Sequence, residues 1–320
     1  MLYALGATLI FGTSFWLYNR CSSLINSILP VETDCESLVF IPTIGRVQIT
    51  RDVIGAGSFS LVLVGLALDR VPQTKVAVKI GMTDRAGIAQ DSWILSTLNG
   101  TANFPIYFGT TEVRCRKSLV FYTRPVLVME LLGLPVDIVA RSAATESESY
   151  RARVALEIGR GVLDGIEIIH KRLGIIMHDI YARNIVLGFN ETGIVPRIID
   201  FGESLLIKSG NREYHQLNSL YTSTREDRNE PLGPRDDIER IVYLMIYIAR
   251  GGTMPWHSLE GDKLILEKAR MDYNTVCMCL PDEILQLLVY ARSGITDAAE
   301  IPNYEYARNL IDTSLSKISM

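Results

Sequence analysis

The sequence predicts an α+β fold in which an antiparallel, β-rich N-terminal lobe precedes a helical C-terminal lobe. Short runs rich in Val, Ile and Leu, separated by turn residues, dominate residues 46–109. Beyond residue 133, apolar residues recur at spacings of three and four. With 48% hydrophobic and 21% charged residues, the chain has a globular composition. We expect an anchor at 1–20, a linker at 21–44, and lobes at 45–132 and 133–316.

The first segment, residues 1–18, carries no charge. As a helix it would be about 27 Å long, close to the hydrocarbon thickness of a bilayer. Trp16, Tyr18 and Arg20 resemble an interfacial anchor and favour a cytoplasmic location for the rest of the chain. A cleaved signal peptide is disfavoured because no basic residue precedes the apolar run. Two alternatives to a membrane anchor stay open, a helix in water and a start codon assigned too far upstream.

The N-terminal lobe is expected to form a small antiparallel sheet with one helix. Strands are predicted at 46–55, 60–68 and 75–80, where the Val-, Ile- and Leu-rich runs lie. An amphipathic stretch from Arg85 to Leu98 predicts the helix. Residues 119–132 are expected to give two strands, broken at Arg124 and Pro125.

The C-terminal lobe is expected to be helical. Residues 149–174 carry an apolar stripe that predicts the first long helix, formed by Val154, Ile158, Val162, Ile166 and Ile169. Residues 235–251 are apolar nearly all round after Glu239 and predict a buried central helix, too short in its apolar part to be a second membrane span. Two more helices are expected at 282–294 and 306–315.

Charge and cysteine usage exclude some classes of function. A net charge of −4 gives no basic face for nucleic acid. The five cysteines are scattered and odd in number, so we expect neither a disulfide framework nor a zinc site. A reducing compartment is the simplest interpretation.

A glycine-rich loop with a following lysine forms the first candidate site. The run from Ile54 through Gly55, Gly57 and Ser60 to Val62 lies between two predicted strands, where a hairpin can fold over phosphates. A simple hairpin turn explains it about as well. Lys79 closes the next strand, nineteen residues after Ser60, and a lysine there can pair the α- and β-phosphates of ATP.

A second group of polar residues follows in the C-terminal lobe. Asp179 and Asn184 lie five apart on a loop after a helix. An aspartate in such a loop can accept a proton from an attacking hydroxyl, and an asparagine can bind a metal ion. Asp200 follows two apolar residues at a strand end, where its carboxylate suits Mg²⁺.

These motifs, in this order, resemble those of eukaryotic protein kinases, and in particular the casein kinase I group. The group-specific part is VMELLGLP at 128–135, RDDIERIVYLMIYIARGGTMPW at 235–256, and LPDEILQLLVYARS with PNYEYARNLI near the end. The resemblance implies the two-lobed kinase fold with ATP and Mg²⁺ as cofactors. Met129 would then be the gatekeeper and Glu130 to Leu132 the hinge facing adenine. Further residues would sandwich the base: Ile54, Val62, Ala77 and Leu187.

The resemblance also implies that Asp237 braces the catalytic loop. A solvated carboxylate at a helix start is the alternative. The helix glutamate that should pair Lys79 aligns with Asp91, which is one methylene shorter and needs a closer helix or a bridging water. An unpaired helix residue is the alternative there.

The catalytic loop departs from the family pattern at two cations. His178 replaces the arginine before the catalytic aspartate, which makes activation by phosphorylation less expected. Tyr181 replaces the lysine two residues after it. Arg183 matches the arginine that tyrosine kinases use instead, and it can supply a permanent charge to the γ-phosphate. Leu220 replaces a basic residue that reads primed phosphosites, so a preference for pre-phosphorylated substrates is not expected.

The leading hypothesis is an ATP-dependent protein kinase that acts on protein substrates, with Ser/Thr preferred over Tyr. Two alternatives remain. The departures at Asp91, His178 and Tyr181 allow a pseudokinase, a nucleotide-binding or scaffold module. A small-molecule kinase of the same fold is the other, and the block at 235–256 argues against it.

Overall fold

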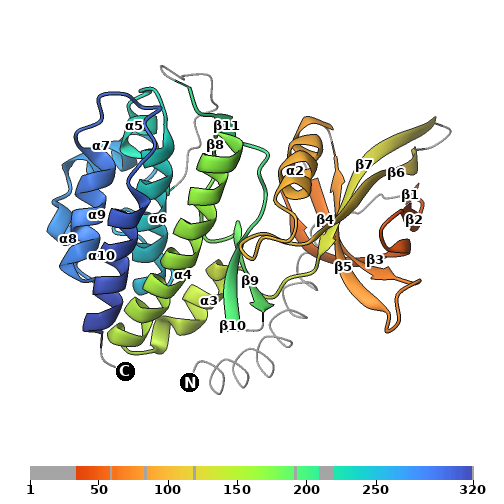
Figure 1. The fold of residues 1–320 in the computed structure, drawn as a ribbon, viewed down its shortest axis with the longest axis horizontal. Helices are drawn as coiled ribbons and strands as arrows, with labels where there is room; N and C mark the ends of the chain where they lie inside the picture. Colours follow the sequence, from red (N-terminus) through yellow and green to blue (C-terminus); the bar gives the residue numbers. More distant parts are fainter. Residues whose placement is uncertain are drawn as a thin grey trace. The chain divides into compact units, whose positions relative to one another are not determined.

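The computed structural model describes residues 34–57, 60–82, 85–117, 120–190, 193–208 and 220–318. The chain divides into two compact units. Unit 1 runs up to Leu132 and includes residues 190–193, and unit 2 comprises residues 133–189 and those from Ile194 onward. Each unit is built around its own arrangement of strands or helices (Figure 1).

Unit 1 is a seven-stranded antiparallel sheet with one helix. The strand order is β1-β6-β7-β5-β4-β3-β2. The helix α2, Arg85–Thr97, packs against β5, β6 and β7 (Figure 1). The strands are β1 (Asp34–Cys35), β2 (Leu38–Ile41), β3 (Gly45–Ala56), β4 (Ser60–Ala67), β5 (Thr74–Gly81), β6 (Tyr107–Lys117) and β7 (Val120–Glu130).

The sheet buries one set of alternating side chains in its core. Successive residues of a strand point to opposite faces, and residues paired across strands share a face. Val76 and Val78 of β5 lie in this core together with Val128 of β7 and are fully buried. The residues between them therefore face the other side of the sheet, which is the side on which the candidate site is built.

Two predictions for unit 1 were wrong in detail. Residues 119–132 do not form two strands, because β7 continues through Arg124 and Pro125. Pairing with β5 ends at Val126, so the missing N–H of Pro125 removes no bond on that side. The partner strand is β6, and it was not predicted. Residues 34–41, expected within a linker, form β1 and β2.

The cysteine prediction also needs correction. Cys35 of β1 and Cys115 of β6 are directly opposite each other in the antiparallel register and form a disulfide. Spacing along the sequence does not reveal this pair, because the two residues are 80 positions apart. The scattered cysteines therefore no longer argue for a reducing compartment. Within the described residues, Cys277 and Cys279 are free.

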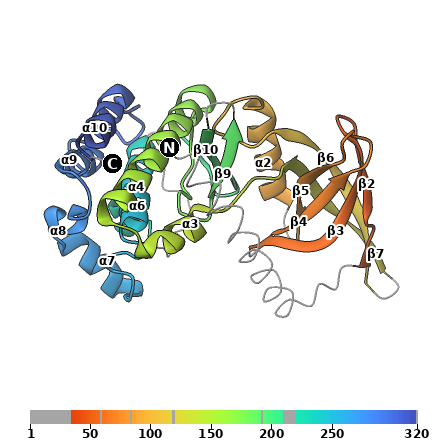
Figure 2. The same ribbon diagram turned by 90° about the horizontal axis from the view of Figure 1, so that it is seen from below.

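Unit 2 is mostly helical, as predicted. Its central helix α6, Pro234–Ala249, is buried along nearly its whole length and contacts α3, α4 and α9 (Figure 2). The other helices are α3 (Val136–Ser142), α4 (Glu148–Ile168), α5 (Thr224–Asp227), α7 (Gly261–Arg270), α8 (Tyr273–Cys277), α9 (Asp282–Arg292) and α10 (Tyr304–Lys317). A short 3₁₀ turn, Ala143–Thr145, follows α3, and a π-turn, Ile169–Leu173, ends α4.

Two small antiparallel sheets of unit 2 carry the loops that hold the polar candidate residues. One pairs β9 (Ile185–Asn190) with β10 (Gly193–Ile198), and the other pairs β8 (Ile175–Ile176) with β11 (Leu205–Leu206). The loop between β8 and β9 contains Asp179 and Asn184, and the segment between β10 and β11 contains Asp200. The two sheets thus anchor both ends of each loop.

The predicted membrane anchor lies outside the described residues. Within them, no helix is both long enough and apolar enough to cross a bilayer.

Candidate active site

The glycine-rich loop is the turn of the β3–β4 hairpin. Gly55 pairs with Val62 and Ala56 with Leu61, and the N–H of Gly57 donates to the carbonyl of Ser60 at 2.9 Å. The register of β3 is irregular between Ile49 and Gly55. The hairpin therefore closes with backbone hydrogen bonds on either side of residues 58–59, and Ile54 lies at its base in the same strand.

Three of the predicted adenine-binding residues of unit 1, namely Val62, Ala77 and Met129, share one face of the sheet with Lys79. Val62 is opposite Lys79, and Ala77 is opposite Met129. Because Ala77 and Lys79 are two residues apart on β5, all four side chains point the same way. Ala77 and Met129 are buried, whereas Val62 is half-buried.

The predicted hinge begins where β7 ends. Glu130 is held by Ile106, whose N–H donates to the Glu130 carboxylate at 3.0 Å and whose carbonyl accepts from the Glu130 N–H at 2.8 Å. Leu132 is half-buried and follows the strand. In unit 2, the Gly133 N–H donates to the Leu187 carbonyl at 2.8 Å. A Cβ at Gly133 would lie 2.9 Å from that oxygen, so the close approach requires glycine.

Lys79 and Asp91 form a direct, buried ion pair. Lys79 Nζ donates to Asp91 Oδ2 at 2.6 Å, and the two side chains are only 8% and 2% exposed. Since α2 packs on β5, the shorter aspartate reaches the lysine without a bridging water. A buried lysine charge of this kind needs such a partner, and the pair fixes the ammonium on the same face as Ala77.

Asp237 binds the backbone at the start of the predicted catalytic loop. Its carboxylate accepts from the backbone N–H groups of Met177, at 2.6 Å, and His178, at 3.0 Å. His170 Nε2 lies 2.9 Å from it, and Arg240 donates at 3.2 Å. Burial alone would raise the pKa of Asp237, but His170, Arg240 and the Met177 N–H hold it below the usual value. The brace is therefore a charged carboxylate. Its hydrogen bonds hold the loop at the point where His178 adopts a left-handed φ of 68°, which is uncommon for a residue other than glycine.

Asp179 and Asn184 are joined across the catalytic loop. Asn184 Nδ2 donates to Asp179 Oδ2 at 2.9 Å and to the Asp179 carbonyl at 3.0 Å. The Asn184 carbonyl in turn accepts from the Ile199 N–H at 3.0 Å, which brings the loop beside Asp200. Burial and the negative charge of Asp200 raise the pKa of Asp179 to about 6.

Oxygen donors thus gather at this point of unit 2. The amide of Asn184 and the carboxylate of Asp200 are the kind of ligand that Mg²⁺ prefers. Besides burial, the negative charge of Asp200 helps to raise the pKa of Asp179, and a bound cation would offset that repulsion. The donor set therefore fits Mg²⁺. Within the described residues, no cluster of three or more His, Cys, Asp or Glu side chains suggests a further metal site.

The structure places Arg183 differently from its expected role. Its side chain is 68% exposed, and its Nε lies 3.6 Å from Asp137 Oδ2 on α3. Asp137 also accepts from Tyr247 Oη at 2.5 Å and pairs with Arg141 at 3.2 Å. Sequence reasoning missed Asp137, because nothing in the α3 sequence marks a carboxylate in the first turn as more than a dipole partner.

Tyr181 lies in an aromatic row. Its ring is 6.0 Å from that of Tyr221, which is 5.6 Å from that of Tyr247. Burial, and the charges of Asp179 and Asp200, raise the pKa of Tyr181 to about 12. Leu220, which stands where the family has a basic residue that reads primed phosphosites, accepts a hydrogen bond from Trp256 Nε1 at 3.0 Å through its carbonyl.

His178 contacts the segment that follows residue 220. Its Nδ1 lies 3.2 Å from the Glu203 carbonyl and its Nε2 3.4 Å from Glu226 Oε1. Glu226 also accepts from the buried Arg240 at 2.5 Å. The residue that replaces the expected arginine is therefore engaged by a carboxylate of α5. Sequence reasoning did not find this carboxylate.

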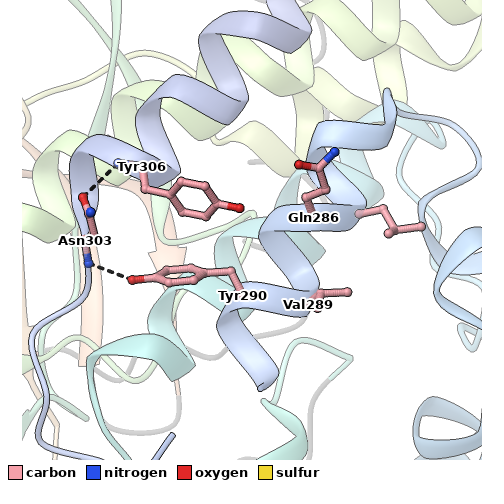
Figure 3. A pocket seen from close by; sticks show the side chains of 6 residues that line it. Gln286, Val289, Tyr290, Asn303 and Tyr306 are labelled. Carbon is pink, nitrogen blue, oxygen red and sulfur yellow. Dashed lines mark hydrogen bonds between the residues drawn. The ribbon is translucent and has the colours of Figure 1, made fainter. Parts of the chain in front are cut away.

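The apolar pocket drawn in Figure 3 lies elsewhere in unit 2, between α9 and the start of α10. Tyr290 and Tyr306 stack edge to face with ring centroids 5.1 Å apart, and Tyr290 Oη accepts from the Asn303 N–H at 2.7 Å (Figure 3). None of the predicted site residues lines this pocket.

The fold and the order of these residues define the class of protein. The first unit is an antiparallel β-sheet that carries a lysine–carboxylate pair, and the second is a helical unit with an Asp–Asn loop braced by Asp237. This is the α+β architecture of protein kinases.

Comparison with known proteins narrows the class. The chain is 26% identical over 283 residues to a probable casein kinase I homologue of Encephalitozoon cuniculi, which covers 82% of this chain and 86% of the relative. It is also 26% identical over 211 residues to casein kinase I homolog 3 of Schizosaccharomyces pombe, covering 60% of this chain and 46% of that protein. No protein-family model matches the chain. The predicted resemblance to the casein kinase I group is confirmed by these two similarities.

Proposed function

We propose that the protein transfers the γ-phosphate of ATP to Ser or Thr hydroxyls of protein substrates, and less readily to Tyr. The observation that carries the proposal is the Asp179–Asn184 hydrogen bond in a loop braced by Asp237. A pseudokinase under no demand for turnover has little need of this arrangement. The casein kinase I resemblance supports Ser/Thr as the acceptor class.

In this mechanism Asp179 is the general base. Its carboxylate accepts the proton of the attacking hydroxyl while the acceptor oxygen forms a bond to the γ-phosphorus. The bond from phosphorus to the bridging oxygen breaks, and its electron pair leaves with ADP. The hydrogen bond from Asn184 keeps the carboxylate of Asp179 oriented as it takes the proton.

The remaining residues bind and orient ATP. Lys79, held by Asp91, would contact the α- and β-phosphates, and Val62, Ala77, Met129 and Leu187 would enclose the adenine. Asn184 and Asp200 would hold Mg²⁺. When bound, the ion neutralises charge on the phosphate oxygens. Arg183 would add a cation at the γ-phosphate after leaving Asp137, a contact of 3.6 Å that is mostly exposed and hence weak.

The test is phosphate transfer by the purified full-length chain. With labelled ATP, Mg²⁺ and a peptide array, we expect incorporation at Ser or Thr. Asp179→Asn should reduce kcat by roughly 10²–10⁴-fold, which is the usual contribution of a positioned base. Unchanged activity in Asp179→Asn would refute the mechanism.

One observation favours a second candidate, a pseudokinase. His178 and Tyr181 stand where the family pattern has two cations, and Arg183, the arginine that could substitute for the lysine, faces Asp137. Nucleotide binding without transfer to any peptide of the array would decide for this candidate.

A further inference from the structure

In the proposed transfer, Arg183 supplies a cation to the γ-phosphate only after it has left Asp137, so it is not preorganised there. Charge spreads over the oxygens of the transferring phosphoryl group, and a donor preorganised toward those oxygens lowers the barrier. The position two residues after the base, where the kinase pattern has a lysine, is Tyr181. A preorganised donor for the phosphoryl oxygens is therefore to be found elsewhere in the loop, and its role rests on the proposed function.

Arg183 is a poor candidate for that donor. Its guanidinium is directed to Asp137, which already receives the Tyr247 hydroxyl and Arg141. With a side chain 68% exposed, it would have to be reoriented and desolvated during each turnover. A preorganised donor avoids that reorganisation.

Tyr181, in contrast, is held in place. Its carbonyl accepts from the Asn184 N–H at 3.0 Å, so it is part of the same turn that orients Asp179. Its ring packs against the buried ring of Tyr221, which packs on Tyr247 of α6. The backbone and the ring are thus fixed independently.

The hydroxyl of Tyr181 is free to act. It makes no hydrogen bond within the part of the chain that the structure describes, and Tyr181 is half-buried. The turn closed by the Asn184 N–H and the contact with the Tyr221 ring hold Tyr181 in the same loop as Asp179, and burial together with the negative charges of Asp179 and Asp200 raises the pKa of its phenol. A phenol is neutral at pH 7 and can donate one hydrogen bond there.

We propose that the Tyr181 hydroxyl donates a hydrogen bond to a non-bridging oxygen of the transferring phosphoryl group, in place of a cation. The proton stays on Tyr181 throughout. The acceptor proton still goes to Asp179, and the electron pair of the broken P–O bond still goes to ADP. Tyr181 is then a catalytic residue of a neutral kind, and the loop works without the lysine.

The experiment compares Tyr181→Phe and Tyr181→Lys with the wild type in the full-length chain. Tyr181→Phe keeps the ring packing and removes only the donor. We expect kcat to fall by about 10²-fold, as for the loss of one such donor, with the KM for ATP little changed. Tyr181→Lys should recover much of the loss, because an ammonium restores a donor at this position.

A binding measurement separates this role from a structural one. ADP with Mg²⁺ and aluminium fluoride mimics the group in transfer, whereas ADP with Mg²⁺ alone does not. Tyr181→Phe should bind the fluoride complex about 10²-fold more weakly and ADP as well as the wild type. Tyr150→Phe, a tyrosine of the first turn of α4, is the matched control and should change neither value.

The outcomes distinguish the two proposals. If Tyr181→Phe keeps the wild-type kcat while Asp179→Asn is inactive, the role of Tyr181 is overturned and the proposed function stands. Equal weakening of ADP and of the fluoride complex would also overturn it, since it would indicate a distorted loop. Absence of transfer by the wild type would overturn the proposed function, and this proposal with it.

Discussion

The Lys79–Asp91 pair is the residue-scale feature that holds the predicted phosphate-binding lysine of unit 1 in place. Both side chains are buried, at 8% and 2% exposure, so each charge has lost its hydration and is stabilised by the other. Removing one partner leaves the other charge in a poorly hydrated place. The pair is therefore as much a matter of stability as of nucleotide binding.

We expect Asp91→Ala to lower the free energy of unfolding by about 3–5 kcal/mol, the usual cost of breaking a buried pair. The double variant Lys79→Met/Asp91→Ala should recover most of that loss, because it removes the stranded charge as well. Urea denaturation of the purified protein measures both values. A double variant as unstable as the single one would contradict this account.

At the residue scale, the sequence predicted which side chains come together more often than the direction in which each one points. Lys79, Asp91, Asp179 and Asn184 could be found because the motif spacing is local and fixed by one strand or one loop. The contact of Arg183 with Asp137 could not be predicted, since it joins the loop to α3, 46 positions earlier in the chain. Such a contact depends on tertiary packing alone.

At the scale of elements, α4 and α6 approach each other closely at a glycine. A Cβ at Gly159 would lie within 2.5 Å of Met245 Cγ on α6. By contrast, a Cβ at Gly87 on α2 would meet nothing within 4 Å. Gly159 is therefore required by the close contact with Met245, whereas nothing in the structure explains the glycine at position 87.

We expect Gly159→Ala to destabilise the protein by about 1–3 kcal/mol through overpacking. The matched change Gly87→Ala should stabilise it by roughly 0.5–1 kcal/mol, because alanine is the better helix former. Thermal or urea unfolding of each variant measures the sign. If Gly159→Ala leaves the stability unchanged, α4 and α6 can separate without cost, and the account is wrong. If the clash with Met245 is the cause, adding Met245→Ala should reduce the loss caused by Gly159→Ala alone.

The same scale shows where pattern reasoning on elements succeeds and fails. The four long helices of unit 2 follow their apolar periodicity and were predicted. Strand β6 escaped prediction because Glu112, Arg114 and Arg116 alternate with Val113 and Cys115, so its mean hydropathy is low. Its burial comes from tertiary contacts with β7, β1, β2 and α2, which the sequence does not reveal. Pro125 argued for a break, and β7 avoids one because β5 ends beside it.

At the scale of the whole molecule, one covalent link joins the first described strand to the sheet. The Cys35–Cys115 disulfide ties β1, near residue 34, to β6. It spans 80 positions of unit 1 and so restricts a long segment of the unfolded chain.

We expect reduction to lower the free energy of unfolding by about 4–5 kcal/mol, the chain-entropy value for a loop of this length. Urea denaturation with and without dithiothreitol measures it. The variant Cys35→Ala/Cys115→Ala should be insensitive to the reductant, which is the control. An unfolding midpoint that ignores dithiothreitol in the wild type would contradict the assignment.

The complete burial of α6 has a consequence for how the protein is made. This helix leaves the ribosome before α9, Asp282–Arg292, which covers one of its sides. Since chains emerge from the N-terminus onward, α3 and α4 are already made when α6 appears, whereas the side of α6 that contacts α9 stays exposed until α9 has been translated. During that interval the nascent chain exposes apolar side chains of α6, the kind of surface from which aggregation starts.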